Sequence, residues 1–245
     1  ESDNFRFCSR GNCQTSESLL QATERMRQDL ARRWLGEGGG EQCWRPKCDI
    51  VLHATAAGYL RAAPGGQQTV GCSSIDAADG KIVRRRIDIR ADQPGWFDAA
   101  LGHELTHVVL ADRFPDGRLP AWADEGMAVL ADASTKQAAH LHDLQAAQSR
   151  RSTFRLAELF ALNSYPAPER QAAFYGQSAS LVRYLIGRGT PEQFVRFVDA
   201  AAGAGYEAAV RDVYRLHGVG DLERRWLREL NGVGGLAAND PARSR

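Results

Sequence analysis

The sequence predicts an α+β fold, with a small mixed sheet in its N-terminal part and a mainly helical C-terminal part. Up to about residue 93, short apolar runs bounded by turn residues indicate strands. After Pro94-Gly95, apolar residues recur with helical spacing as far as about Leu230. An order of strands first and helices second is typical of α+β proteins. We therefore expect one catalytic domain of two lobes with a cleft between them.

The N-terminal lobe, residues 1–93, is expected to contain a long helix and a small sheet. The helix covers Ser16–Leu35, where apolar residues fall near one side, and it ends at a glycine-rich stretch. A turn at Asp79-Gly80 predicts a hairpin between the last two strands. The strands are expected over Asn4–Cys8, Asp49–Ala54, Thr69–Ile75 and Lys81–Arg90.

The C-terminal lobe, residues 94–231, is expected to be helical throughout. Residues 232–245 are mostly Gly, Ala and polar, and we expect them to form a flexible tail. The helices are expected over Trp96–Asp112, Ala121–Ala133, Gln137–Gln148, Leu156–Leu162, Arg170–Arg188, Pro191–Ala202, Tyr206–Leu216 and Asp221–Leu230.

Composition and charge exclude some classes of function. The 245 residues carry 31 Lys and Arg against 30 Asp and Glu, a formal net charge of +1. So balanced a charge argues against binding nucleic acid or an anionic membrane surface. No run of about eighteen apolar residues occurs, so no membrane span is predicted. The sequence does not predict an oligomeric state.

The cysteines bear on the cellular compartment. Four of the five form two similarly spaced pairs, Cys8 with Cys13 and Cys43 with Cys48, and Cys72 is the fifth. We expect disulfides of unassigned pairing, and hence a secreted, periplasmic or surface-anchored protein, because disulfides persist in oxidising compartments. The start at Glu1 suits a sequence whose targeting segment has been removed. There are two alternatives to disulfides. One is a structural zinc ion bound by four thiolates, and the other is that the cysteines are free thiols.

The most informative motif is HExxH in the segment Leu101 to Val109. On a helix, His103 and His107 lie one turn apart and can reach one metal ion, with Glu104 beside them. With six His and thirty Asp plus Glu in the chain, only about 0.02 accidental matches are expected. These three residues are also the only ionisable ones between positions 99 and 111. Three such groups in an apolar helix are costly unless they are paired or coordinated.

A third metal ligand is expected from the next helix. Glu125 lies in the segment Trp122-Ala123-Asp124-Glu125-Gly126-Met127-Ala128, and its helical neighbours are apolar. A turn signal at Pro115-Asp116-Gly117 lets this helix fold back on the motif helix. Glu125 is therefore the preferred ligand, ahead of Asp124 and Asp132, and the fourth position is left for water.

Together, His103-Glu104-Leu105-Thr106-His107 and the later Trp-Ala-Asp-Glu-Gly-Met-Ala stretch resemble the gluzincin metallopeptidases, the group that includes thermolysin and the zinc aminopeptidases. The resemblance is strong from about Leu101 to Leu130. It implies a zincin-like fold and one catalytic zinc ion held by two His and one Glu, with the motif Glu as general base. The separation of His107 and Glu125 is slightly shorter than in the aminopeptidases.

Less specific signals suggest supporting residues. Tyr175, which begins a long helix, is the first candidate for donating a hydrogen bond to the oxyanion, followed by His140 and His142; the alternative is that Tyr175 is a packing residue with a satisfied hydroxyl. Asp112 and Asp132 are candidates for orienting the imidazoles, or else solvated carboxylates near helix ends.

The strand before the motif helix is a candidate for binding substrate. We expect Ile82–Arg90 to be an edge strand along which an extended peptide adds, as the gluzincin resemblance also implies. Arg84, Arg86 and Arg90 share one face of it, which favours either acidic or sulfated substrates or simply solubility.

Three functions are compatible with the sequence. The preferred one is hydrolysis of peptide bonds in a peptide or protein substrate by a zinc endopeptidase. The alternatives are a catalytically silent zincin-fold module that binds a peptide or glycoprotein, and a zinc hydrolase of a non-peptide amide. The intact Glu104 favours an enzyme over the silent module, since only catalysis requires that base.

Overall fold

The computed structural model describes residues 1–10, 16–63, 69–93 and 95–238, with side chains of the last helix described to residue 231. The chain forms two compact units. The first comprises residues 1–119 and 127–139, and the second comprises residues 120–126 and 140–245. The motif helix falls in the unit that contains the sheet. The expected boundary near residue 93 stays a prediction.

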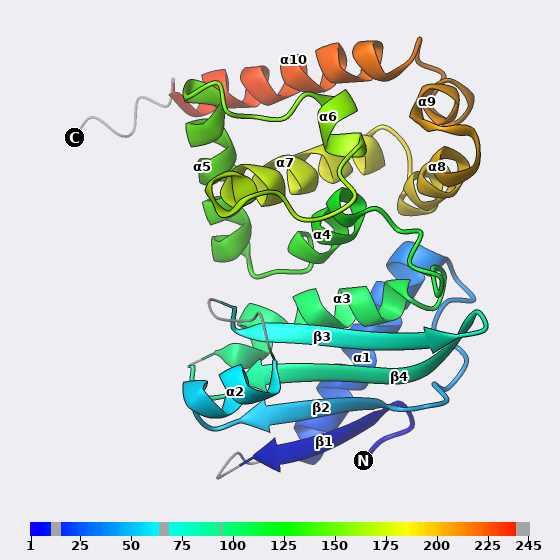
Figure 1. Cartoon of the computed structure of the whole chain (residues 1–245), viewed down its shortest axis with the longest axis vertical. Helices are drawn as coiled ribbons and strands as arrows, with labels where there is room; N and C mark the ends of the chain where they lie inside the picture. Colours follow the sequence, from blue (N-terminus) through cyan, green and yellow to red (C-terminus); the bar gives the residue numbers. More distant parts are fainter. Residues whose placement is uncertain (11–15, 64–68, 94, 239–245) are drawn as a thin grey trace. The chain divides into compact units, whose positions relative to one another are not determined.

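The first unit is built on a mixed sheet of four strands in the order β1-β2-β4-β3 (Figure 1). Strands β1 (Phe5–Arg10), β2 (Cys48–His53) and β4 (Lys81–Arg90) are parallel, while β3 (Gly71–Ala78) is antiparallel to β4. The expected hairpin turn is present, with positive φ at both Asp79 and Gly80. This arrangement confirms the α+β fold with a small mixed sheet.

Helix α1 (Glu17–Leu35) has defined caps at both ends. The Ser16 side chain accepts a hydrogen bond from the Leu19 amide, and Gly36 ends the helix with φ of 88°. The buried side of α1 carries Leu30 and Trp34. It packs against α3 (Gly102–Leu110), which also packs against β3. The sheet and these helices enclose the core of the first unit.

The expected position of the edge strand is wrong. β4 is an internal strand, paired with β2 on one side and with β3 on the other. Its residues Ile87, Asp88 and Ile89 are all buried, as suits an internal strand. In the sheet of the described residues, β3 is the outer strand next to β4. The sequence suggests a solvent-exposed edge because β4 carries several arginines, which are usually exposed.

Those arginines are instead paired within the chain. Arg84 forms an ion pair with Asp76, Arg86 binds Asp88 through two nitrogens, and Arg90 binds Asp92. Each guanidinium is therefore paired with a carboxylate on, or just after, the strands β3 and β4. The structure gives no reason to assign them to an acidic substrate.

A buried stack on Trp44 ties the sheet to the end of α3. The guanidinium carbons of Arg27 and Arg85 lie 5.1 and 4.9 Å from the centre of the Trp44 ring. The Trp44 Nε1 donates to Asp112 Oδ2 at 2.6 Å, and the Arg85 guanidinium binds the other oxygen of the same carboxylate. Asp112 therefore neutralises a buried arginine and anchors the motif helix, rather than orienting an imidazole.

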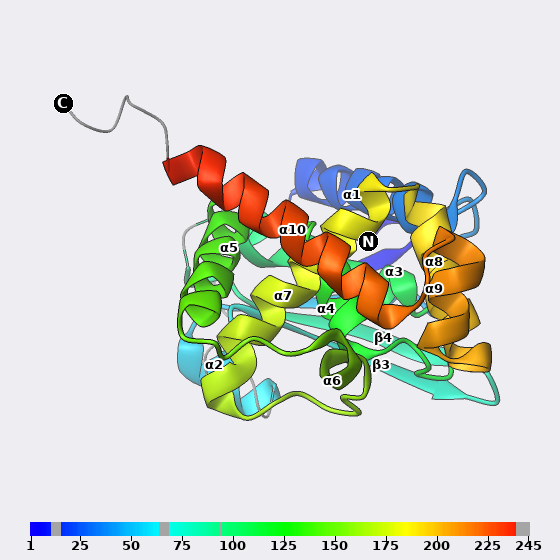
Figure 2. The same cartoon turned by 90° about the horizontal axis from the view of Figure 1, so that it is seen from above.

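The second unit is helical, with an aromatic core. Its helices include α6 (Leu156–Phe160), α7 (Pro168–Gly187), α8 (Pro191–Ala204), α9 (Tyr206–Tyr214) and α10 (Val219–Ala238). Helix α10 packs against α6, α7 and α9, and α8 packs against α9 (Figure 2). The division between the units falls within α4 (Ala121–Val129) and α5 (Ser134–Ser149).

Three features differ from the expected elements. A short helix, α2 (Ala56–Ala62), follows β2 where the sequence predicts none. The motif helix is preceded by a π-helical turn, η1 (Phe97–Leu101), instead of one continuous α-helix. Helix α10 extends to Ala238, through part of the expected flexible tail; residues 239–245 lie outside the described residues. Among the described residues, no helix is long and apolar enough to span a membrane.

The structure contains no disulfide among the four described cysteines. Cys8, Cys43, Cys48 and Cys72 all have free thiols, and Cys13 lies outside the described residues. Burial raises the pKa of the Cys48 thiol, so this residue behaves as a small apolar core side chain. A pairing through Cys13 and the extracytoplasmic location stay predictions.

The stack on Trp44 makes a testable prediction for stability. In Asp112→Ala the buried guanidinium of Arg85 loses its carboxylate, and we expect the free energy of unfolding to fall by about 2–3 kcal/mol. Asp116→Ala is the matched control, because its half-exposed carboxylate pairs with exposed Arg118; it should change stability by less than about 0.5 kcal/mol. Urea denaturation measures both, and equal effects would contradict the role assigned to Asp112.

Candidate metal centre

The HExxH motif lies on α3, directly after the π-helical turn. π-helical turns inside helices are frequent at functional sites. His103 and His107 follow one another by one turn, with ring centres 5.0 Å apart, and both are partly exposed. Glu104 is buried, with 8% of its surface exposed. The other residues of α3 are all buried, and their packing fixes the direction in which the motif side chains project.

Glu125 lies on α4, which is anchored by the tryptophan one turn before it. Trp122 is 1% exposed, contacts the ring of Phe160, and donates from Nε1 to the Tyr206 hydroxyl at 2.9 Å. Gly126, next to the glutamate, allows close packing on α7, since a Cβ there would lie 2.7 Å from the Ser178 carbonyl oxygen. These contacts hold the Glu125 side chain in place, with 4% of its surface exposed.

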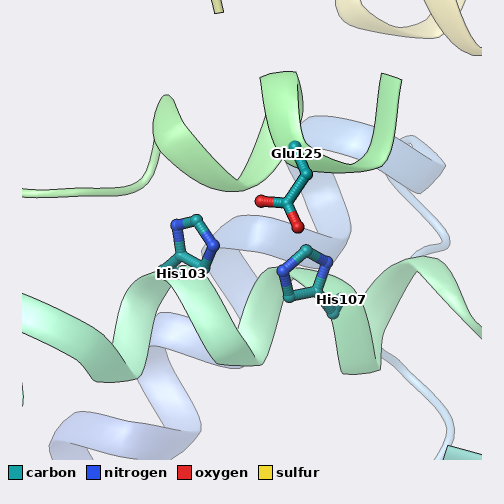
Figure 3. Close-up of side chains that lie close together, drawn as sticks. All are labelled: His103, His107 and Glu125. Atoms are coloured by element: carbon teal, nitrogen blue, oxygen red, sulfur yellow. The ribbon is translucent and has the colours of Figure 1, made fainter. Parts of the chain in front are cut away.

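The structure brings the three expected ligands together (Figure 3). One ligand atom each from His103, His107 and Glu125 lies within 4.8 Å of the other two. Two imidazole nitrogens and a carboxylate oxygen are a donor set that suits zinc with one further position open. Among the described residues, no other group of three or more His, Cys, Asp or Glu side chains brings its ligand atoms so close together. The three residues thus form a candidate metal site.

The buried motif glutamate lies against the start of β3. A Cβ at Gly71 would lie 2.7 Å from Glu104 Cγ, which is too close for a Cβ contact, and 3.1 Å from its Oε1, which is a tight contact. Only glycine therefore lets the first residue of β3 pass so near to Glu104. No periodic or motif signal in the sequence marks this role, because the two residues are far apart in the chain.

Asp132 is placed to orient one of the imidazoles. Its Oδ2 lies 3.2 Å from His103 Nδ1, and its Oδ1 accepts from Lys136 Nζ at 2.9 Å. A carboxylate on one ring nitrogen directs the other nitrogen towards a metal. Of the two aspartates considered for this role, Asp132 fits it and Asp112 does not. The candidacy of Asp132 as a metal ligand stays a prediction.

Tyr165 contacts the candidate site, although the sequence did not predict it as a site residue. It lies between α6 and α7, and its hydroxyl donates to Glu125 Oε1 at 2.5 Å. Burial, and next the charge of Glu125, raise the pKa of the Tyr165 hydroxyl far above its usual value, so it remains a donor. No local pattern marks this residue, because its partner is 40 positions away.

The candidates for an oxyanion donor lie near one another on two helices. Tyr175 is in the second turn of α7, partly exposed, and its ring centre is 5.7 Å from that of His140 on α5. His142, also on α5, is exposed. The structure therefore places the first two candidates side by side. The role of each stays a prediction, as does that of Asp124 as a lesser ligand.

Comparison with known protein families identifies the superfamily of the chain. A family model described as the Peptidase MA superfamily matches residues 75–232, well over half of the chain. The chain belongs to this superfamily, a zincin-like metallopeptidase group. No curated protein matches the sequence. Both the motif helix and Glu125 lie inside the matched range.

The close approach of Gly71 to Glu104 can be tested by adding one methyl group. Gly71→Ala forces Glu104 or β3 to move, so we expect the free energy of unfolding to fall by about 1–3 kcal/mol. Gly187→Ala is the control, because a Cβ at Gly187 meets nothing within 4 Å; its stability should stay within about 1 kcal/mol of wild type. Thermal unfolding compares the variants, and a neutral Gly71→Ala would contradict the packing described.

Proposed function

We propose that this chain is a zinc-dependent peptidase that hydrolyses internal bonds of a peptide or protein. The observation that carries the proposal is the group formed by His103, His107 and Glu125, with Glu104 on the same helix as the two histidines. Membership of the Peptidase MA superfamily supports a metallopeptidase-type function. The gluzincin resemblance supports the finer assignment, because it assigns the same residues to the same roles.

In the proposed reaction, separate residues bind the metal, transfer the proton and stabilise the oxyanion. His103, His107 and Glu125 would hold the zinc ion, which when bound acidifies water and polarises a carbonyl group. Glu104 accepts a proton from the attacking water and returns it to the leaving amine. Its burial keeps it from bulk solvent, and Gly71, which has no Cβ, leaves the space that its side chain occupies beside β3. Tyr175 is proposed as the donor to the developing oxyanion, with His140 as second choice.

The outer strand β3 is the proposed binding edge for an extended substrate. In the sheet of the described residues, β3 is the outer strand and pairs with β4, and its first residue lies against the proposed base. A peptide that adds to such an edge by main-chain hydrogen bonds is held in an extended conformation. This assignment replaces the strand Ile82–Arg90, which is internal.

Removing the base should separate catalysis from metal binding. Glu104→Gln keeps the size of the side chain but cannot accept the proton, so we expect zinc to remain bound and hydrolysis of a peptide library to fall at least about 100-fold. Glu158→Gln, a change on α6 outside the group, should keep wild-type activity. Full turnover by Glu104→Gln would overturn the assignment of the base. Stoichiometric zinc without any cleavage by the wild type would favour a silent binding module.

Removing a ligand should abolish metal binding and activity together. His103→Ala deletes one of three protein donors, so we expect substoichiometric zinc by elemental analysis and no hydrolysis. His217→Ala removes an exposed histidine outside the group and should behave as wild type. A chelator should likewise inactivate the wild type, and added zinc should restore it. Activity that survives both treatments would show that the chemistry does not depend on a metal.

A further inference from the structure

Tyr165 contacts the candidate site, although no role in the proposed reaction requires it. Its hydroxyl donates to one oxygen of Glu125, Oε1, at 2.5 Å, yet 51% of the residue is exposed. Exposed aromatic residues usually keep their polar atoms in water. Here the polar atom is turned inwards to a buried carboxylate, which suggests that the contact has a function beyond packing.

The segment that carries Tyr165 is restricted in conformation. Pro166 follows the tyrosine directly, and a residue before proline is confined largely to extended backbone conformations. Ala167 is extended, with φ of −53° and ψ of 150°, and Pro168 is the first residue of α7. The phenol is therefore presented from a stiff connection to α7, which lowers the entropy lost in holding one hydroxyl at one position.

Aromatic packing fixes the ring as well as the backbone. The Tyr165 ring lies edge-to-face against Phe174, with centres 6.0 Å apart, and Phe174 is fully buried on α7. Phe174 in turn contacts the ring of Phe154. One side of the phenol thus rests on the core of the second unit while its hydroxyl reaches Glu125. The arrangement is rigid enough to direct a carboxylate.

We propose that Tyr165 is a positioning residue that holds Glu125 through Oε1, so that the metal is bound by the other carboxylate oxygen alone. The inference rests on the proposed function, in which Glu125 is a zinc ligand. A carboxylate with both oxygens available can bind a metal through one or two of them. A donor fixed on Oε1 favours the one-oxygen mode and keeps a coordination position for water or substrate.

Tyr165→Phe removes only the hydroxyl and leaves the packing of the ring in place. The apoprotein is loaded with zinc in competition with a chromophoric chelator, and separately with cobalt, whose visible spectrum reports coordination number. We expect zinc affinity to fall about 10–100-fold, as for other partners of metal ligands. The cobalt absorption bands should become weaker, because two-oxygen binding raises the coordination number.

Tyr214→Phe is the matched control, since it removes a buried tyrosine hydroxyl on α9. It should keep the zinc affinity and cobalt spectrum of the wild type. Wild-type affinity and spectrum in Tyr165→Phe would overturn this inference and leave the metal site intact. A wild-type protein that binds neither ion would overturn the proposed function and this inference together, before any variant is compared.

Discussion

The cost of placing ionisable groups among the apolar side chains of α3 constrains the rest of the site. His103, Glu104 and His107 stand on an otherwise apolar helix that packs against α1 and β3. Charged and polar groups in such surroundings are stable only with partners. The structure supplies a partner for His103 in Asp132 and brings a carboxylate oxygen of Glu125 within 4.8 Å of a nitrogen of each imidazole. The requirement for partners explains why α4 carries a glutamate among apolar neighbours.

Several neighbouring features then serve to hold these groups in place. The stack of Arg27, Trp44 and Arg85 fixes the end of α3 through Asp112. The aromatic cluster around Trp122 fixes α4, and so Glu125. None of these contacts touches a reacting group. They matter because a metal site requires its ligands to stay in position before the metal arrives, and rigid packing provides that.

Much of the site was predictable from sequence because it depends on local spacing. The HExxH motif and the apolar neighbours of Glu125 are visible in short windows, and so are the hairpin at Asp79-Gly80 and most helices. Gly71 and Tyr165 were not predictable, because each acts on a residue distant in the chain. Strand order is likewise non-local: the arginines of β4 suggested an edge, whereas pairing with both β2 and β3 makes it internal. The π-helical turn before α3 leaves no signature in the hydrophobic pattern.

The central claim is that two imidazoles and one carboxylate of this chain bind zinc. X-ray absorption spectroscopy of the zinc-loaded protein tests it most directly, because it reports the ligand atoms and their distances. The account predicts nitrogen and oxygen ligands at about 2.0–2.2 Å, with the multiple-scattering pattern of two imidazoles. Sulfur ligands at about 2.3 Å would instead indicate a cysteine site. Such a spectrum, or failure to bind zinc at all, would contradict the account.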